Sequence, residues 1–277
     1  MTIYESIAEA QAKGGDHGDD ASWNEAYFID WQAQSHSFLG GSSITVDGVE
    51  WLVGDQDSAT TLEAGVNGLE IEPKTSINSG WEGYAPKNAP RVMASIQDLT
   101  YVSGALLPSA TYTQAICIQA IITSATDVTA NNDGYGLVLQ NGATTTHVTN
   151  VRQYDSSAWP GAPNVGYRMG NVATPGLTPE TYITSAMTAA QHTFFEITYL
   201  PGGTVIATSS TDTDFVDPLS ATEFQGFVAT QNTATSTASS ITFNKDDMYV
   251  AFMAYNMGSS TVFTPTCRQL RVLTLGV

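Results

Sequence analysis

The chain has 277 residues, 42% of them hydrophobic and only 13% charged, so it can bury a sizeable core beneath a surface of mainly neutral polar side chains. Acidic residues outnumber basic residues by 27 to 9, which gives a formal net charge of −18. Because surfaces that bind phosphate groups need lysine and arginine, this balance argues against nucleic acid as a partner.

The N-terminal region, residues 1–42, differs in pattern from the rest of the chain. Residues 2–13 predict a short amphipathic helix that begins with the capping-box pair Thr2 and Glu5. A single helix of this length is marginally stable alone, so we expect it to dock on its own domain or on a partner. Residues 14–42 combine glycine and aspartate with several aromatic residues, which indicates an extended or partly helical arm. We therefore interpret residues 1–42 as an attachment arm.

Neither a signal peptide nor a membrane segment is expected. The first residues lack the basic start and the apolar core of a secretory signal. No apolar run approaches the ~20 residues that a membrane-spanning helix requires. We therefore expect no membrane partner, and a route other than ordinary secretion if the protein works outside a cell.

Hairpin patterns appear from residue 43 onward. Residues 194–200 (FFEITYL) alternate between apolar and polar side chains, and residues 204–210 (TVIATSS) resume an extended run. Between them, Pro201-Gly202-Gly203 favours a tight turn, because proline fixes φ and glycine accepts positive φ. Asp47-Gly48 marks a second predicted hairpin in the same way.

The whole of residues 43–277 is predicted to be one all-β domain. About a dozen strand-like runs follow one another, and the only candidate helix among them is 179–187. Some runs, such as 248–256, are apolar on both faces, whereas others have one polar face, as two stacked antiparallel sheets require. The two cysteines, Cys117 and Cys267, lie in strand-like runs and are either free buried thiols or a single bridge.

The order of the strand types resembles the concanavalin-like lectin/glucanase superfamily. The segments that carry the resemblance are CIQAIIT (117–123), GYGLVLQN (134–141), FFEITYLPGGTVIATS (194–209), GFVATQN (226–232), MYVAFMAYNMG (248–258) and CRQLRVLTLGV (267–277). The resemblance covers about residues 110–275 and implies a two-sheet antiparallel jelly-roll sandwich, here with a short helical or irregular N-terminal arm. It also implies that the last strand pairs back near the first, which residues 65–73 could supply.

The catalytic signature of the superfamily's glucanases is missing from this sequence. That signature is a strand with alternating acids, Glu-x-Asp-x-(x)-Glu, whereas here only Glu70 and Glu72 alternate, before Pro73. Retaining glycosidases need two carboxyl groups about 5 Å apart, which alternate strand positions can provide. Glu70 and Glu72 are thus the candidates for a polysaccharide-degrading enzyme, but solvent-facing acids explain them equally well. We predict a protein that is not an enzyme.

Calcium is the one candidate metal, and the chain predicts no other cofactor. Ca²⁺ takes several oxygen ligands, which Asp127, Asn131, Asn132 and Asp133 could supply from one loop between two strands. The alternative is that these side chains cap the turns of that loop.

A predicted glycan-binding loop spans residues 152–171. A sugar stacks its apolar face on an aromatic ring while its hydroxyl groups need hydrogen-bond partners, and this segment offers both. The candidate residues are Arg152, Tyr154, Asp155, Trp159, Asn164, Tyr167 and Arg168. Residues 78–88, with Trp81 and Tyr84, form a second candidate patch. Alternatively, these rings pack beneath their own loops or against a neighbouring subunit.

Few charges, many small polar residues and the absence of a secretory signal are typical of a bacteriophage or other virion structural protein. We expect a capsid decoration, head-fibre or tail-adhesion component, located on the virus particle. Its arm, residues 1–42, would bind other capsid proteins, and its jelly roll would form a homo-oligomer such as a trimer and contact host surface glycan. The alternatives are a stand-alone carbohydrate-binding lectin module and the polysaccharide-degrading enzyme.

Overall fold

The computed structural model describes most of the predicted β domain. The described residues are 23–40, 43–75, 81–82, 85–86, 89–101, 115–129, 133–141, 147–154, 165–172, 181–187, 190–200, 204–218, 228–229, 233–238, 247–256 and 262–275. The helix predicted over residues 2–13 lies outside them.

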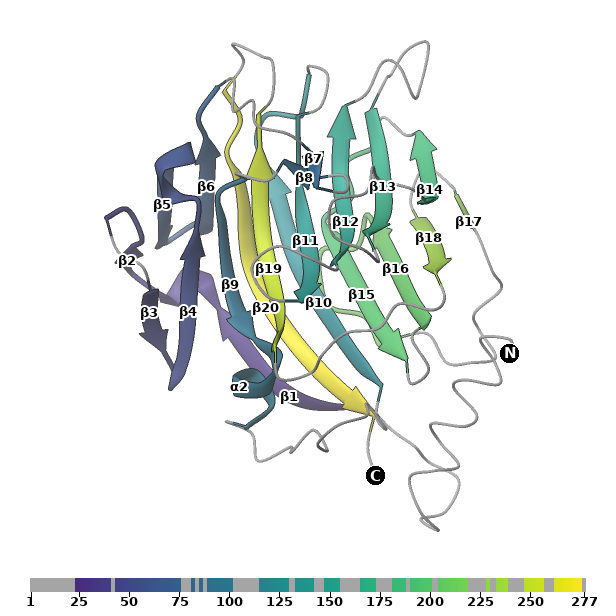
Figure 1. Ribbon diagram of the computed structural model, residues 1–277, viewed down its shortest axis with the longest axis horizontal. Helices are drawn as coiled ribbons and strands as arrows, with labels where there is room; N and C mark the ends of the chain where they lie inside the picture. The colour runs from purple at the N-terminus through teal and green to yellow at the C-terminus, as the bar shows by residue number, and fades with distance from the viewer. Residues whose placement is uncertain are drawn as a thin grey trace.

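Two antiparallel sheets form the body of the molecule, which confirms the all-β sandwich (Figure 1). Sheet A has the order β17 (Val228–Ala229), β18 (Thr233–Ala238), β16 (Thr204–Ser210), β15 (Phe194–Leu200), β10 (Ile116–Ser124), β20 (Pro265–Leu275), β6 (Gly68–Pro73), β5 (Ala59–Gly65) and β2 (His36–Ser37), with β1 (Trp23–Asp30) also paired to β20. Sheet B has the order β14 (Thr181–Met187), β13 (Val165–Val172), β12 (His147–Tyr154), β11 (Gly134–Asn141), β19 (Met248–Tyr255), β9 (Arg91–Ser95), β4 (Val49–Gly54) and β3 (Ser43–Val46).

The smaller elements are a hairpin, two 3-10 turns and one short helix. They are β7 (Trp81–Glu82), β8 (Ala85–Pro86), η1 (Trp31–Ala33), η2 (Gln56–Ser58) and α2 (Ile96–Tyr101). In the part of the chain that the structure describes, no helix is long and apolar enough to cross a lipid bilayer.

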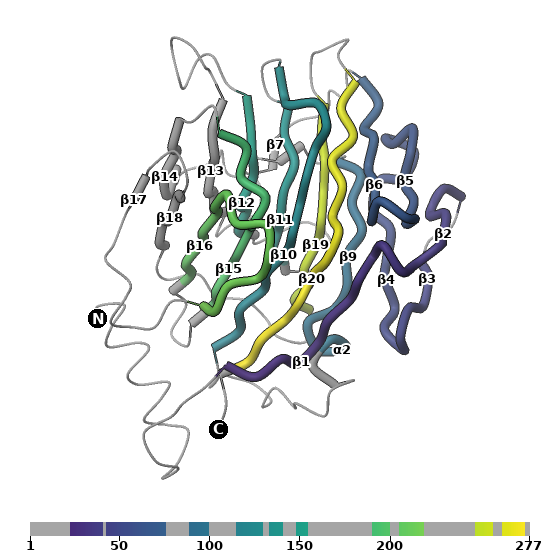
Figure 2. Tube along the Cα trace, turned by 180° about the vertical axis from the view of Figure 1, so that it is seen from behind, coloured from purple at the N-terminus to yellow at the C-terminus, as the bar shows by residue number. Residues whose placement is uncertain are grey.

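The core lies between the two sheets, and alternation along each strand places side chains in it. On β10, Ile116, Ile118 and Ile122 face sheet B and are fully buried, whereas Cys117 and Gln119 point to the other side of sheet A. Burial of each such isoleucine contributes about 1.5–3 kcal/mol to the stability of the fold. Sheet B faces the viewer in Figure 1, and sheet A in Figure 2.

The attachment arm predicted over residues 1–42 overlaps with the sandwich in the structure. β1 pairs with β20 from Trp23 to Asp30, and it supplies Tyr27 and Ile29 to the core. Residues 23–40 therefore belong to the sandwich, although the sequence pattern assigns them to the attachment arm. The aromatic residues explain this difference, because side chains of that size gain most by burial in the core.

An aromatic cluster anchors this part of the chain. The ring of Trp31 lies edge-on to that of Trp51 at 4.8 Å between centroids, and 6.2 Å from the ring of Phe38. All three side chains are fully buried. The cluster ties η1 and the segment around β2 to strand β4 of the other sheet.

Three predicted features are confirmed and one is wrong. The hairpin at Asp47-Gly48 joins β3 to β4, with Asp47 at a φ of 51°, and residues 194–200 and 204–210 pair antiparallel as β15 and β16. The predicted first strand, as β6, pairs with β20. Residues 181–187, within the candidate helix 179–187, form strand β14 instead, because they complete the edge of sheet B beside β13.

The two cysteines are free and buried, with Cys117 on the outer side of sheet A and Cys267 in the core.

Candidate functional site

The predicted glycan loop is largely a strand pair. Arg152 and Tyr154 end β12, and Tyr167 and Arg168 lie in β13, where Tyr167 is directly opposite Arg152. Tyr154 is half-buried and packs against the core. Asp155, Trp159 and Asn164, and Tyr84 of the second patch, lie outside the described residues.

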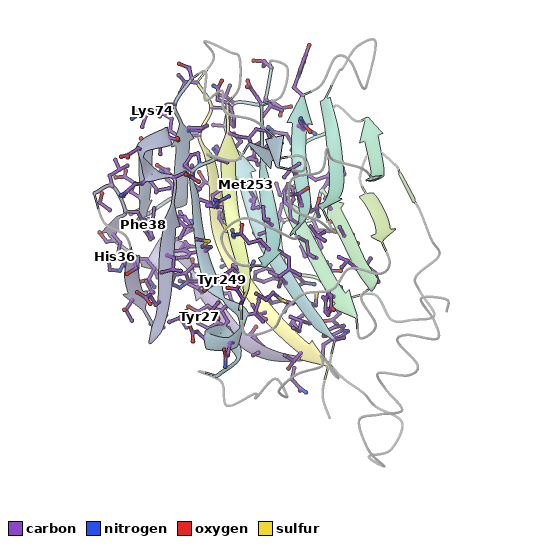
Figure 3. The ribbon with its side chains drawn as sticks, in the orientation of Figure 1. Tyr27, His36, Phe38, Lys74, Tyr249 and Met253 are labelled. Atoms are coloured by element: carbon purple, nitrogen blue, oxygen red, sulfur yellow. The ribbon has the colours of Figure 1, made fainter. Side chains whose placement is uncertain are left out.

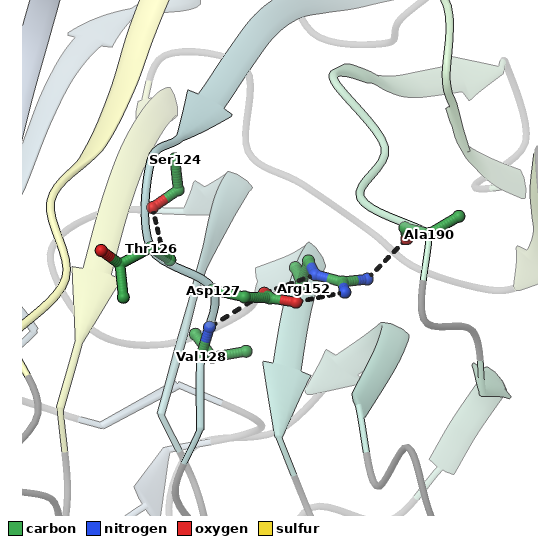
Figure 4. A network of polar contacts seen from close by, with 6 residues as sticks. All are labelled: Ser124, Thr126, Asp127, Val128, Arg152 and Ala190. Carbon is green, nitrogen blue, oxygen red and sulfur yellow. Dashed lines mark hydrogen bonds and ion pairs between the residues drawn. The ribbon is translucent and has the colours of Figure 1, made fainter.

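Arg152, one of the predicted sugar contacts, is held by other groups of the protein. Its side chain is fully buried and bonds to both carboxylate oxygens of Asp127, with Nε–Oδ1 at 2.8 Å and Nη2–Oδ2 at 2.6 Å (Figure 4). Nη1 donates a third hydrogen bond to the backbone oxygen of Ala190 at 2.9 Å. A bidentate pair of this kind is among the strongest polar contacts in proteins. In this structure its guanidinium is therefore engaged by Asp127 and Ala190.

The ion pair between Arg152 and Asp127 also involves a residue of the predicted calcium loop. Both oxygens of Asp127 are engaged by Arg152, and Oδ1 also accepts a hydrogen bond from the backbone N–H of Val128. Asp133 is fully buried, and Asn131 and Asn132 lie outside the described residues. A cation at Asp127 would have to displace the guanidinium. Within the described ranges, no group of three His, Cys, Asp or Glu side chains is placed to hold a metal ion.

Glu70 and Glu72, the candidate hydrolase pair, lie on β6 at the outer side of sheet A, since Leu69 and Ile71 enter the core. Each has a local partner. Glu70 Oε1 accepts from Asn67 Nδ2 at 2.8 Å, and Glu72 Oε2 accepts from the hydroxyl of Thr264 at 3.4 Å.

A set of side chains that the sequence reasoning missed lies on the outer face of sheet B, the face turned away from sheet A. Strand register defines three rows across β12, β11 and β19, because directly paired residues point to the same side. The rows are Gln153–Gly134–Tyr255, Val151–Gly136–Met253 and Thr149–Val138–Ala251. Figure 3 labels Met253 and Tyr249 along β19. Side chains alternate along a strand, so the segment HVTNVRQY places Thr149, Val151 and Gln153 on one face. This alternation is the signal in the sequence that predicts the set.

Gly134 has no Cβ and therefore leaves room on this face for the side chain of Tyr255. A Cβ there would lie 2.4 Å from Oη of Tyr255, so glycine is what allows the Tyr255 ring to lie down across β11. Ala89, between β8 and β9, packs on the same face with Val151 and Met253.

Two polar side chains on this face are buried without being satisfied. Gln153 and Thr149 are fully buried, and neither the side-chain amide of Gln153 nor the hydroxyl of Thr149 has a hydrogen-bond partner among the described residues. Each such group costs about 1–3 kcal/mol, so a protein that keeps two of them on the same face of one strand, with Val151 between them, calls for an explanation.

The charged group bordering this face is neutralised locally. Arg91 lies on β9 opposite Met253, and its guanidinium forms an ion pair with Asp55 at 3.1 Å. Partial burial raises the pKa of Asp55, and the charge of Arg91 acts in the opposite direction.

No protein family matches the sequence, and neither does any protein of curated function. Similar solved structures do exist. The CBM2 module of the evolved Dit of Lactobacillus casei BL23 phage J-1 is 9% identical, with a TM-score of 0.44 over 92% of this chain and 97% of that one. An engineered GH43 glycoside hydrolase is 10% identical, with a TM-score of 0.49 over 93% of this chain and 42% of that one. Peanut lectin is 11% identical, with a TM-score of 0.38 over 87% of this chain and 98% of that one.

These similar structures are jelly-roll proteins, and this chain has the jelly-roll fold. All three TM-scores lie below 0.5, so the fold assignment rests on the strand order itself.

Proposed function

We propose that the protein is a carbohydrate-binding jelly-roll module without catalytic activity, carried on the surface of a virus particle. The observation that carries the binding role is the pair Gln153 and Thr149, which are buried on the outer face of sheet B without hydrogen-bond partners in the described part of the chain. Sugar hydroxyl groups both donate and accept, so they would satisfy an amide and a hydroxyl together.

The surroundings of this pair favour a sugar over a more polar or a wholly apolar ligand. Val151, Met253 and the Tyr255 ring present apolar surface beside the two polar groups. Sugars combine apolar C–H faces with rings of hydroxyl groups, and binding sites for them combine the same two features.

Binding is favoured over hydrolysis by the composition of the face. In the three rows across β12, β11 and β19, the described side chains include no carboxylate. Two-carboxylate hydrolysis needs an acid pair flanking the sugar. Glu70 and Glu72 lie on the outer side of the other sheet, each with a hydrogen-bond partner of its own.

The particle context is supported by the sequence profile alone: an acidic chain with few charges and a surface of small polar residues. Because residues 23–40 belong to the sandwich, attachment through the arm falls to residues 1–22. A symmetric oligomer on the particle, such as a trimer, fits this role.

The test of the binding role is a glycan array probed with the full chain, followed by titration of the best sugar against two variants. Gln153→Leu and Thr149→Val remove the unsatisfied groups, and both variants should be more stable to heat than the parent protein but should bind the sugar at least about tenfold more weakly. Gln269→Leu, on the outer side of sheet A, is the matched control and should bind normally. If the two variants gain stability and keep full affinity, the site is elsewhere.

The test of the particle context is electron cryomicroscopy of the source particle, with labelling by antibody against the purified chain. Label on the particle surface supports the role. Absence of the chain from purified particles that infect normally would overturn it, whatever the array shows.

A further inference from the structure

A second surface, on the outer face of sheet A, is built around one row of paired residues. Register aligns Glu196 of β15, Gln119 of β10, Arg271 of β20 and Phe28 of β1 across four neighbouring strands. All four lie on the side of sheet A that faces away from sheet B. The segment 211–218, which follows β16, runs across this row.

Side chains of the row fasten the 211–218 segment to the sheet. The backbone oxygen of Val216 accepts two hydrogen bonds, from Nε2 of Gln119 at 2.8 Å and from Nη2 of Arg271 at 2.9 Å. The Arg271 guanidinium also lies 4.6 Å from the centre of the Phe215 ring. At the start of the segment, the hydroxyl of Ser210 donates to Asp212 Oδ2 at 2.5 Å. The segment is therefore held at both ends.

Apolar side chains of the segment and of β1 are partly exposed beside each other. Phe28 is 41% exposed and Val216 is 37% exposed, and the rings of Phe28 and Phe215 meet edge-on at 6.3 Å. Isolated exposed apolar residues are common, but contiguous ones on a rigid support mark interaction sites. We call Phe28, Phe215 and Val216 the apolar patch.

Acidic residues surround the apolar patch. Asp214 and Asp217 flank Phe215 and Val216 in the segment and are exposed, and Glu25 and Asp30 flank Phe28 on the same face of β1. The one basic group described in the row, Arg271, is already bonded to Gln119 and Val216. The rim of the patch therefore carries net negative charge.

We propose that the apolar patch is a docking surface for a protein partner that presents an apolar or aromatic side chain between lysine or arginine residues. Charge complementarity favours this partner, because its lysine or arginine residues would face the acidic side chains around the patch. These are Glu25, Asp30, Asp214 and Asp217. A second copy of the chain fits poorly, because its formal net charge is −18. The fixed segment lowers the entropy cost of binding.

This surface is independent of the proposed sugar site. The outer faces of sheets A and B point in opposite directions, so a sugar and a protein partner can be bound at the same time (Figures 1 and 2). One face would hold the molecule to its partner while the other meets a glycan.

The test uses the full chain and three synthetic amidated peptides, KLWKLWK, ELWELWE and KSGKSGK, with affinities measured by fluorescence anisotropy at physiological salt. The first combines charge with apolar side chains and should bind. The second reverses the charge and the third lacks apolar groups, and each should bind at least about tenfold more weakly.

The double variant Phe28→Ser/Val216→Ser should bind KLWKLWK about tenfold more weakly than the parent protein. The control is Val66→Ser/Val262→Ser, since those side chains are 84% and 51% exposed elsewhere, and it should bind normally. Asp214→Asn/Asp217→Asn, which leaves the apolar residues in place, should weaken binding and reduce its salt dependence. Equal binding of KLWKLWK by the parent protein and by Phe28→Ser/Val216→Ser, or equal binding of KSGKSGK and KLWKLWK by the parent protein, would overturn the proposal. Glycan binding by Phe28→Ser/Val216→Ser should be unchanged, which separates this test from that of the sugar site.

Discussion

Nε of Arg271 donates a 2.7 Å hydrogen bond to the side-chain oxygen of Gln119, although the two residues are 152 positions apart in the chain. This contact fixes the orientation of the Gln119 amide, whose nitrogen then points at the buried carboxylate of Glu196 at 2.6 Å. A positive and a negative group are thus joined through a neutral amide on the outer side of sheet A. The stability of the fold should respond to the titration of Glu196.

The first prediction concerns pH. Burial raises the pKa of Glu196 above its ordinary value of 4.5, and hydrogen bonds from Gln119, Cys117 and Thr198, together with the charge of Arg271, only partly offset this. The folded protein therefore binds this proton more tightly than the unfolded chain. The resulting stability is fully present below pH 4.5 and is lost as the pH rises through the pKa of the folded state.

Glu196→Gln should remove this loss of stability at higher pH. Urea unfolding at a series of pH values from 4 to 8 should give the variant a flatter profile than the parent protein. Glu63→Gln, an exposed position on β5, serves as the control and should follow the parent. Parallel profiles for parent and Glu196→Gln would contradict the prediction.

The second prediction concerns the buried ion pair of Arg152. Asp127→Ala removes the carboxylate that both Nε and Nη2 contact, and leaves a buried guanidinium short of its main partner. The free energy of unfolding should fall by about 3 kcal/mol, the usual cost of breaking such a pair from one side. Chemical denaturation measures it, and Asp57→Ala, at an exposed position, should change stability by less than about 0.5 kcal/mol.

The third prediction concerns the space beside Tyr255. Gly134→Ala places a Cβ 2.4 Å from Oη of Tyr255 and 2.8 Å from the backbone oxygen of Arg152, so the ring or the strand must shift. The expected loss of stability is about 1–3 kcal/mol. Gly65→Ala meets no atom within 4 Å and has no positive φ, and its thermal unfolding should match that of the parent.

The fourth prediction concerns the N-terminal strand. Deleting residues 1–42 removes β1 from the edge of β20 and takes Trp31 and Phe38 out of the core. The truncated chain should fail to fold, as judged by loss of near-ultraviolet circular dichroism. Trp31→Ala should lower the free energy of unfolding by about 3–5 kcal/mol, whereas Leu39→Ala, at an exposed position, should have little effect. A folded 43–277 fragment would contradict this prediction.

The fifth prediction concerns the thiols. Cys117 and Cys267 are fully buried, and burial raises the pKa of both above the ordinary value for cysteine. Neither thiol should react with a thiol reagent in the folded protein within the time in which both react in denaturant. Fast labelling of the native state would show that one of the strands that carry them opens readily.

Local patterns predicted most of the strands, but they failed where a bulge interrupts alternation. In β1, the register shifts between Glu25 and Tyr27, so the residues around Ala26 do not alternate cleanly and the segment looks irregular. The turn that Asp47-Gly48 predicts depends on neighbouring residues only, so the sequence specifies it directly.

The site residues were harder to predict because their partners are distant in sequence. Arg152 follows a run rich in polar residues and precedes aromatic ones, which favours an exposed site, yet its partner Asp127 comes from another loop. The row of Gln153 and Tyr255 depends on β11 lying between β12 and β19, which alternation within one strand does not reveal.

The place of β20 in sheet A has a consequence for how the chain folds. This strand, the last in the described chain, pairs with β10, β6 and β1, and it aligns Trp23 with Leu275. Until it is inserted, β10 has an open edge and β6 and β1 have no strand between them and β10. Loop closure over nearly the whole chain must therefore precede the central pairing of the sheet, which makes folding slow and strongly cooperative. During that interval the exposed edge of β10 is the part of the molecule most prone to pair with another chain.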